Sequence, residues 1–345
     1  MHPLVIDTDP GCDDAMAIAY ALAHPDLELL ALTTVFGNTT VAKTTRNARW
    51  LLERFGARDV AVAQGAAVPL EQAPLPTAEF VHGEDGIGNV YPSGEAGAAL
   101  SEDARHAEVL EMDAADLIID TARRRPGELR LVAIGPLTNI AEALRRDPQL
   151  PSRVHSLVIM GGTVDEPGNV TPLAEANFHN DPHAADEVLA HDWPVTVVGL
   201  DVTHRIMIRD SDLDRIGREA GRAGELIRAS SRFYVDFYTR QGAARAAHAA
   251  GGEAACAMHD AAAVICVVMP DAFTTVTGGA RVVPDGMAAG QLALDRVGYR
   301  YARPDWADRA PVSVCMGVDV ERVHADFIDT LVAGHTAAQA GRGRA

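Results

Sequence analysis

The first fourteen residues hold a cluster of acidic side chains directly after a short apolar run. Residues 4–6 (Leu-Val-Ile) precede Asp7, Asp9, Asp13 and Asp14, so four carboxyl groups fall within eight positions. Carboxylates this close repel one another unless a cation or a polyhydroxyl ligand offsets their charge. The apolar run predicts a buried strand that leads into a helix, and open α/β sheets bind their ligands at such strand ends. The cluster therefore predicts a metal-dependent enzyme that acts on a small polar substrate.

Strand-like and helical segments alternate along the rest of the first 200 residues. Strands are expected at 4–8, 27–35, 60–62, 129–134, 154–160 and 195–200, and helices at 14–23, 41–55, 113–125, 139–146 and 184–190. This β-α-β order predicts a mostly parallel sheet with helices on both faces. The expected fold class is α/β, with an open, Rossmann-like sheet in a single domain that spans residues 1–333.

Three stretches depart from the alternation. Residues 73–101 combine prolines, glycines and acidic residues, and a long irregular loop in a compact domain is usually functional. Residues 210–257 have a largely helical pattern and are expected to form a cap or flap over the sheet. The last residues, 334–345, are expected to be a disordered tail.

The charge and composition of the chain exclude several classes of function. Hydrophobic residues make up 48% and charged residues 23% of the 345 residues, which is typical of a globular protein. The formal net charge of -18 disfavours nucleic acids and anionic membranes as partners, because both bind basic surfaces. Lys43 is the only lysine in the sequence, so the chain has no GK[ST] phosphate-binding loop.

Cysteine usage and the lack of targeting signals predict a cytoplasmic protein. The four cysteines, at positions 12, 256, 266 and 315, form no CxxC pair and are expected to be reduced thiols. Cys12 lies within the acidic cluster, where neighbouring carboxylates disfavour a nucleophilic thiolate. The sequence shows no signal peptide and no uninterrupted apolar stretch long enough to cross a membrane.

The acidic cluster has a structural alternative that explains only half of it. Asp13 and Asp14 fall in the first turn of the expected helix, where the helix dipole favours acids that need no further role. That alternative leaves Asp7 and Asp9 on the strand end unexplained. Because adjacent helical residues point about 100° apart, Asp13 and Asp14 can serve different partners, one the metal and one the substrate. Carboxylate oxygens suit calcium or magnesium better than zinc.

Polar side chains also gather in a loop between residues 168 and 177. Asn169, Glu175 and Asn177 can donate to and accept from vicinal hydroxyl groups, and the glycine and proline residues around them mark a loop. A loop that simply contains many turn-forming residues is the alternative.

Two further segments are ambiguous by themselves. Gly135-Pro136 follows an expected strand and leaves a strand-end carbonyl free, although an ordinary strand-turn-helix joint has the same pattern. The pair His259-Asp260 is common by chance, and a histidine that packs into the core is the usual alternative.

Taken in order, these segments resemble the inosine-uridine preferring nucleoside hydrolases over nearly the whole chain. The matching segments are residues 7–17 (DTDPGxDDAxA), Phe36-Gly37-Asn38, His82-Gly83-x-Asp85-Gly86, residues 135–141 (GPLTNIA), Met160-Gly161-Gly162, residues 168–177 (GNxTPxAExN), residues 200–204 (LDVTH) and His259-Asp260. The full ordered set is far more specific than any one segment.

The resemblance implies an activity and a metal site. The implied reaction is hydrolysis of the N-glycosidic bond of a ribonucleoside, which gives ribose and the free base, with a bound Ca²⁺. The implied calcium ligands are Asp9, Asp14, Asp260 and the backbone carbonyl of Ile134. Asp9 would also be the general base that activates the water.

The resemblance also implies which residues bind the substrate. The residues implied to bind the ribose hydroxyls are Asp13, Asn38, Asn169, Glu175 and Asn177. His82 and His259 would face the base, with His259 as the candidate proton donor to it. Relatives form dimers or tetramers, which implies a homo-oligomer.

The sequence departs from the family pattern on the base side. Ala176 stands where many relatives carry phenylalanine, and Ala261 stands where proline is common. Residues 242–257 match no base-pocket pattern. The resemblance therefore predicts no preference between purine and pyrimidine nucleosides.

Two other functions fit parts of the sequence. In a DxD-type phosphatase, Asp7 would be phosphorylated and Asp9 would be the acid, but that class usually needs a lysine near the phosphate and a later acidic magnesium loop. A non-catalytic nucleoside-binding protein on the same fold is the second alternative, because a fold does not settle activity.

Overall fold

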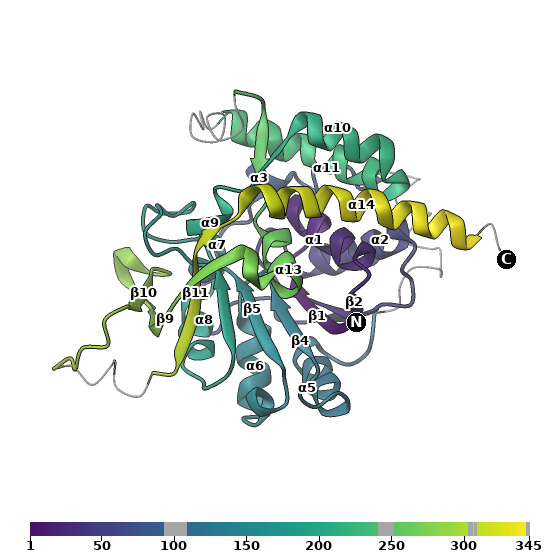
Figure 1. Cartoon of the computed structure of the whole chain (residues 1–345). Coiled ribbons are helices and arrows are strands. Elements are labelled where there is room, and N and C mark those ends of the chain that lie inside the picture. The colour runs from purple at the N-terminus through teal and green to yellow at the C-terminus, as the bar shows by residue number, and fades with distance from the viewer. Residues whose placement is uncertain (93–108, 241–251, 303–305, 307–308, 343–345) are drawn as a thin grey trace.

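The computed structural model describes residues 1–92, 109–240, 252–302, 306 and 309–342. These residues form an α/β fold around a nine-stranded sheet (Figure 1). In spatial order the strands are β10 (Leu292–Asp295), β9 (Phe273–Val282), β11 (Pro311–Val318), β6 (Val195–Val198), β5 (Ser156–Met160), β4 (Arg130–Ala133), β1 (His2–Thr8), β2 (Leu27–Thr34) and β3 (Ala61–Gln64).

The sheet is mostly parallel, as the sequence predicted. Every neighbouring pair from β11 to β3 is parallel, and β9 pairs antiparallel with both β10 and β11. The strands and helices predicted within the first 200 residues all occur, with ends displaced by a few residues. Strands β9, β10 and β11 were not predicted from the sequence, because much of each is exposed or half-buried and none has a continuous buried apolar run.

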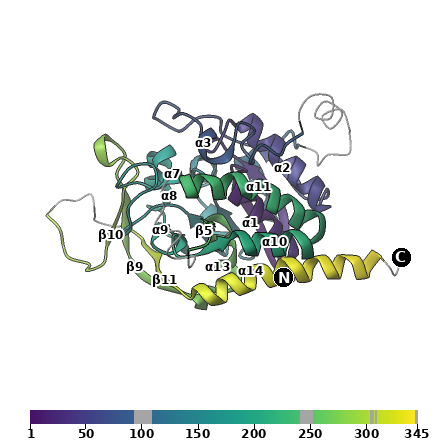
Figure 2. The same cartoon turned by 90° about the horizontal axis from the view of Figure 1, so that it is seen from above.

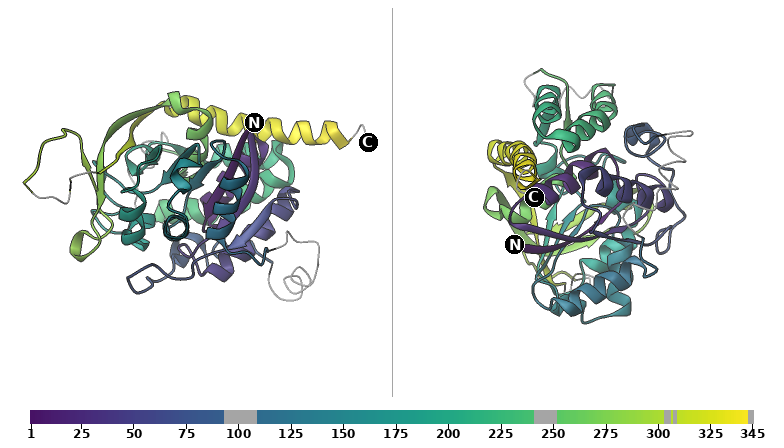
Figure 3. Two further views of the ribbon diagram at one scale, coloured as in Figure 1. Left: turned by 90° about the horizontal axis from the view of Figure 1, so that it is seen from below. Right: turned by 90° about the vertical axis from the view of Figure 1, so that its right-hand side faces the viewer.

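Helices cover both faces of the sheet (Figure 3). The helices on one face are α1 (Cys12–Ala23), α2 (Val41–Phe55), α11 (Gly221–Arg240), α13 (Asp260–Val268) and α14 (Val320–Arg342), and those on the other are α5 (Ala114–Arg124), α6 (Thr138–Arg146) and α8 (Pro182–Val188). Strand β1 shows why its residues are apolar throughout. Leu4 and Ile6 pack into the core on the first face and Val5 into the core on the second, so both sides are buried.

The order of the strands creates a crevice beside β1. From β1 the chain adds β2 and β3 toward one edge of the sheet, and it then adds β4, β5 and β6 toward the other edge. Connections therefore leave in opposite directions from the paired strands β1 and β4. Ligands of open α/β sheets bind at this switch point, at the carboxyl ends of the strands. The acidic cluster follows β1 and Ile134 follows β4, so the topology brings both to one crevice.

A helical pair lies above this end of the sheet. The segment for which we expected a cap contains α10 (Asp210–Glu219) and α11, and Figure 2 shows α11 lying along α1, against which it packs. The strands β7 (Met207–Arg209) and β8 (Ala255–Ala257) pair at its base, so residues 255–257 form a strand rather than the expected helix. Residues 241–251 of this segment lie outside the described residues.

Helices occur in both of the segments that were expected to be irregular, residues 73–101 and 334–345. Helix α3 (Glu79–His82) interrupts the stretch 73–101, of which residues 93–101 are outside the described part of the chain. Helix α14 continues to Arg342, so regular structure extends into the segment 334–345, for which the sequence predicted none. None of the helices that the structure describes combines the length and the apolar character needed to cross a membrane.

Helix α14 is fixed to the rest of the fold by an aromatic contact with α1. Phe327 is fully buried and its ring stacks on that of Tyr20 at a centroid distance of 6.1 Å. The Tyr20 hydroxyl also donates a hydrogen bond to Asp326. We expect Phe327→Ala to lower the free energy of unfolding by about 3–5 kcal/mol, measured by urea denaturation, because it leaves a cavity between the two helices.

The matched control lies on the exposed side of the same helix. The side chain of Asp329 is 71% exposed and makes one ion pair with Arg215. Asp329→Ala should cost less than about 1 kcal/mol. Equal losses for the two variants would contradict the docking role of Phe327.

Candidate active site

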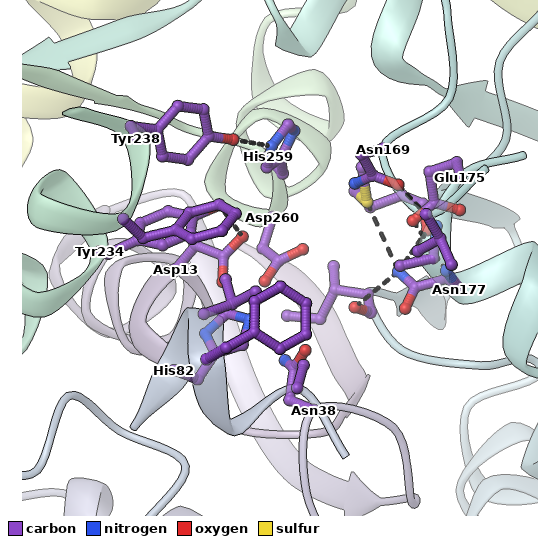
Figure 4. A pocket seen from close by; sticks show the side chains of 18 of the residues that line it. Asp13, Asn38, His82, Asn169, Glu175, Asn177, Tyr234, Tyr238, His259 and Asp260 are labelled. Carbon is purple, nitrogen blue, oxygen red and sulfur yellow. Dashed lines mark hydrogen bonds between the residues drawn. The ribbon is translucent and has the colours of Figure 1, made fainter. Parts of the chain in front are cut away.

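A cavity of about 340 Å³ lies at the carboxyl ends of the central strands, beneath the helical pair (Figure 4). The predicted site residues that line it are Asp13, Asn38, His82, Ile134, Asn169, Glu175, Asn177, His259 and Asp260. Asp9 and Asp14 do not line the cavity, but both are buried and both contact Asn38, which does. The structure thus brings together side chains that are up to about 250 positions apart in the sequence.

The side chain of Asp14 is held in place from three directions at the start of α1. The Thr8 hydroxyl donates to Oδ1 at 2.5 Å, and the Gly11 backbone N–H donates to Oδ2 at 2.8 Å. The amide of Asn38 also donates to Oδ2, at 3.2 Å. Pro10-Gly11 turns the chain sharply after β1, and this turn allows the carboxylate to reach back to its own N-cap residue.

Two glycines make room for the carboxylate of Asp9. A Cβ on Gly37 would lie 2.0 Å from Oδ2, and one on Gly135 would lie 2.8 Å from Oδ1. Oδ2 accepts a hydrogen bond from the Asn38 backbone N–H at 2.7 Å. Oδ1 is buried and has no hydrogen-bond partner among the described residues. The fold therefore keeps one oxygen of Asp9 available for a group that the protein itself does not supply.

Three carboxyl groups converge next to Asp9. Asp13, Asp14 and Asp260 each place an oxygen within 4.8 Å of the others, and all three are buried. Asp9 lies close enough for its pKa to be raised by Asp14, after the larger effect of burial, but it is not one of these three. Asp13, which the sequence assigned to the sugar, is one of them.

The carboxylates of Asp13, Asp14 and Asp260 repel one another, and a positive charge between them would stabilise their ionised forms. Burial, and then the neighbouring Asp14, raise the pKa of Asp13 to about 8. Burial raises the pKa of Asp260 well above its usual range, with further contributions from Asp13, Asp14 and Asp9. Oδ1 of Asp13 is a second buried oxygen without a partner in the described part of the chain. A bound divalent cation would remove this repulsion, and an all-oxygen donor set fits a hard cation.

The opposite wall presents amide and carbonyl groups. The Asn177 side-chain amide donates to the Ile134 carbonyl and to the Met160 carbonyl, each at 3.1 Å. Ile134 lines the cavity, and its strand-end carbonyl is the acceptor of the first of these two bonds. The side-chain oxygen of Asn169 accepts from the Ala176 backbone N–H at 3.0 Å, which orients its amide group.

Glu175 has a structural role as well as a place in the wall. It caps α7 (Ala176–Asn180), and its two oxygens accept from the backbone N–H groups of Gly162, Asn177 and Phe178. Burial raises the pKa of this carboxyl to about 7 despite those bonds. Glu175 therefore holds Asn177 in position while it lines the cavity.

Two histidines lie on the side of the cavity away from the amide wall. The His82 Nδ1 accepts from the Cys12 backbone N–H at 3.2 Å, and burial lowers the pKa of His82 to about 3. A neutral ring that accepts at Nδ1 carries its proton on Nε2. His259 contacts the hydroxyl groups of Thr203 at Nδ1, 2.7 Å, and of Tyr238 at Nε2, 2.8 Å. Burial also lowers the pKa of His259, and His204 and His82 lower it further.

An aromatic wall that was not predicted from the sequence lies beside these histidines. It consists of Phe80 from α3 and Tyr234, Phe237 and Tyr238 from α11. The rings contact one another, with Phe80 and Phe237 edge to face at 5.9 Å across the two helices. A signal was present in the sequence: aromatic residues make up 5% of the chain, yet they recur at 233, 234, 237 and 238 with helical spacing.

Asp7 points away from the cavity. The Thr33 hydroxyl donates to its Oδ1 at 2.5 Å and the Asn139 amide donates to the same oxygen at 2.8 Å. Burial raises the pKa of this carboxyl to about 7, and Asp7 is not among the lining residues. This position disfavours the phosphatase alternative, in which Asp7 would be the nucleophile.

Comparisons with known proteins agree with this geometry. The family model described as "Inosine-uridine preferring nucleoside hydrolase" matches residues 4–325. Uridine nucleosidase 1 of Arabidopsis thaliana is 38% identical over 321 residues, which cover 93% of this chain and 90% of that protein. The inosine-uridine preferring nucleoside hydrolase of Crithidia fasciculata is 37% identical over 332 residues, which cover 95% and 96%.

Solved structures give the same result. A plant nucleoside hydrolase, the PpNRh1 enzyme, superposes with a TM-score of 0.86 at 36% identity and covers 96% of this chain and 99% of that one. A purine-preferring ribonucleoside hydrolase from Gardnerella vaginalis gives a TM-score of 0.83 at 29% identity and covers 97% and 99%. The chain belongs to the inosine-uridine preferring nucleoside hydrolase family.

Proposed function

We propose that this protein hydrolyses the N-glycosidic bond of ribonucleosides to ribose and the free base. One observation carries the proposal: a group of buried carboxyls converges at one end of a cavity whose other surfaces are amide groups and aromatic rings. This arrangement suits a ligand with a polyhydroxyl half and a flat aromatic half. The relatives named uridine nucleosidase and inosine-uridine preferring nucleoside hydrolase support the same substrate class.

We propose Ca²⁺ as the cation of the carboxyl group. The partnerless buried oxygens of Asp9 and Asp13 and the convergence of Asp14 with Asp260 support a hard divalent ion there. Asp9, Asp14, Asp260 and the Ile134 carbonyl would hold it. When bound, such an ion orients water and lowers its pKa, though less strongly than zinc does.

Asp9 is the proposed general base. Its Oδ1 accepts no hydrogen bond within the described structure, while Oδ2 is fixed by the Asn38 backbone, so the free oxygen has a defined direction. Transfer of a proton from water to this oxygen produces the nucleophile that attacks the ribose carbon. General-base catalysis of this kind contributes roughly 10²–10⁴-fold.

The carboxyl and amide groups around the sugar favour its developing charge. Breaking the bond to the base builds positive charge on the ribose carbon and ring oxygen, as in O-glycoside cleavage. Fixed oxygens stabilise that charge more in the transition state than in the substrate. The residues proposed to bind the ribose hydroxyls are Asp13, Asn38, Asn169, Glu175 and Asn177.

The leaving base requires a proton or a hydrogen bond as it departs. His259, in contact with the Tyr238 hydroxyl, is the proposed donor. His82 carries its proton on Nε2 and stacks near the Tyr234 ring at 5.5 Å, on the side where the base would lie. The aromatic wall would contact the faces and edges of the base.

A binding protein without turnover is the remaining alternative. An enzyme is favoured because Asp13, Asp260 and the candidate acid His259 line a single cavity, and the candidate base Asp9 lies behind its wall in contact with the lining residue Asn38. A receptor would need the amide and aromatic walls but not a buried carboxylate with a free oxygen.

Two further properties are part of the proposal. We propose a cytoplasmic location. The four cysteines support it, because all are buried and none forms a disulfide bond. We also propose a homo-oligomer, a dimer or a tetramer, on the resemblance to relatives alone.

The proposed activity predicts release of reducing sugar from ribonucleosides. The purified protein, assayed with inosine, uridine, adenosine, guanosine and cytidine, should release ribose and free base from at least one of them. The 2′-deoxyribonucleosides should react poorly, because the polar groups placed for the 2′-hydroxyl would be left unpaired. Stoichiometric binding of ribonucleosides with no ribose release would identify a binding protein instead.

The proposed base predicts the effect of one conservative substitution. Asp9→Asn keeps the shape of the side chain but removes the proton acceptor, so kcat should fall by at least about 100-fold. Steady-state kinetics with the best nucleoside of the panel measure it.

Asp7→Asn, two residues earlier in the last part of β1, is the matched control. An amide oxygen can replace Oδ1 and keep the bonds from Thr33 and Asn139, while the NH₂ group takes the place of the partnerless Oδ2. We expect Asp7→Asn to keep kcat within a few-fold. Equal kcat for Asp9→Asn and the wild type would rule out Asp9 as the base.

The proposed calcium site predicts a binding measurement that is independent of turnover. Calorimetric titration of the chelator-treated protein with CaCl₂ should show one site, and Asp260→Asn should weaken it by at least about tenfold. Asp7→Asn should bind like the wild type, because Asp7 lies outside the carboxyl group. If the treated protein binds no Ca²⁺, or if activity survives exhaustive chelation, the calcium assignment is wrong.

A further inference from the structure

One motif found in the sequence has no role in the function proposed so far. Residues 200–204 (LDVTH) form the one-turn helix α9 (Leu200–Thr203) and its C-cap residue, directly after β6. Thr203 is fully buried, and its hydroxyl lies 2.7 Å from Nδ1 of His259. The two residues are 56 positions apart in the sequence. This contact joins the end of a sheet strand to the histidine proposed to protonate the base.

The backbone fixes the approach of these two segments. Beyond α9 the chain continues into β7, which pairs with β8, and the Met258 N–H donates to the Ile206 carbonyl at 2.9 Å. His259 is the next residue after Met258, so its position relative to α9 is set by this ladder. The start of α9 is also anchored, because the Leu200 N–H donates to the Gly162 carbonyl at 3.0 Å.

The ring of His259 has a hydroxyl partner at each nitrogen. Thr203 lies at Nδ1, and Tyr238, from the cap helix α11, lies at Nε2. A hydroxyl can donate or accept, so the Thr203 contact is compatible with a proton on either nitrogen of the ring. A ring held at Nδ1 cannot rotate without losing that bond, and its Nε2 edge therefore stays directed toward Tyr238 and the aromatic wall.

We propose that Thr203 is a positioning residue that holds the Nε2 edge of His259 toward the departing base. The inference rests on the function proposed above and deepens it. Thr203 touches no substrate, because it is not among the cavity-lining residues, and it acts only through the ring of His259. In the reaction, water forms the new bond to the ribose carbon and gives a proton to Asp9, while the N-glycosidic bond breaks and the base takes the bonding electron pair. The protonated ring of His259 gives its Nε2 proton to the base and returns to the neutral form.

The test compares substrates that differ only in the need for that proton. Nucleosides need help for the base to leave, whereas 4-nitrophenyl β-D-ribofuranoside releases a stable nitrophenolate without protonation. Thr203→Val keeps the size of the side chain and removes the hydroxyl. We expect kcat/KM for inosine and uridine to fall by about tenfold, the order expected for one hydrogen bond, and kcat/KM for the nitrophenyl riboside to change less than about twofold.

Two further variants separate positioning from packing. Thr203→Ser restores the hydroxyl and should recover most of the nucleoside activity. In a His259→Ala background, Thr203→Val should cause no further loss, because the group that Thr203 positions is already gone. Thr203→Val keeps the shape of the side chain, so its thermal unfolding temperature should fall by no more than the loss of one buried hydrogen bond explains.

The outcomes distinguish this inference from the proposed function. Equal losses on both substrate types, full activity of Thr203→Val, or a further loss in the His259→Ala background would overturn the role of Thr203 while the hydrolase activity stands. Failure of the wild-type protein to cleave any riboside would overturn the proposed function and this inference with it.

Discussion

The central constraint on this structure is the burial of several carboxyl groups at one point, where none of the described residues forms an ion pair with them. Asp9, Asp13, Asp14 and Asp260 are all nearly inaccessible, and burial raises the pKa of each of them. Repulsion by neighbouring carboxyl groups raises the pKa values of Asp9, Asp13 and Asp260 further. Moving charged groups out of water is costly unless something pairs with them. Backbone N–H groups, a hydroxyl and an amide donate hydrogen bonds to Asp9 and Asp14 and offset part of this cost. One oxygen each of Asp9 and Asp13 has no hydrogen-bond partner among the described residues. The other residues of the site surround the position that we propose for a divalent cation.

The topology of the sheet explains how so few residues assemble such a site. The strands β1 and β4 are neighbours whose connections leave in opposite directions, so the loops that follow them diverge and leave a crevice between them. Asp260 reaches the same place from α13, which packs against α1. Glu175 shows the economy of the arrangement, because one carboxylate both caps α7 and forms part of the wall. The geometry is thus a property of strand order and helix starts more than of any single loop.

Much of this could be predicted from the sequence, and the failures have physical reasons. The acidic cluster was visible because carboxylates are unusual in a core and these follow an apolar run, whereas Ile134 was indicated by the Gly135-Pro136 turn after it and the polar loop by its glycine and proline residues. The strands β9, β10 and β11 were not, because they lie at the edge of the sheet with half-exposed faces. The aromatic wall escaped because ring residues on a helix normally indicate core packing, and only the fold shows that Tyr234, Phe237 and Tyr238 face a cavity. The membership of Asp13 in the carboxyl group depends on distances that spacing along the chain does not contain.

The placement of the aromatic wall on the cap helix has an evolutionary consequence. The groups proposed to handle sugar and cation belong to the sheet and the helices packed on it, whereas Tyr234, Phe237 and Tyr238 belong to α11. Substitutions at Phe237 would reshape the surface offered to a nucleobase without touching the acidic crevice, whereas the hydroxyl groups of Tyr234 and Tyr238 contact Asp13 and His259. Base selectivity can therefore change at position 237 while the residues proposed to break the N-glycosidic bond are kept. Relatives that share the scaffold can differ in the nucleobases they accept and still use the same reaction.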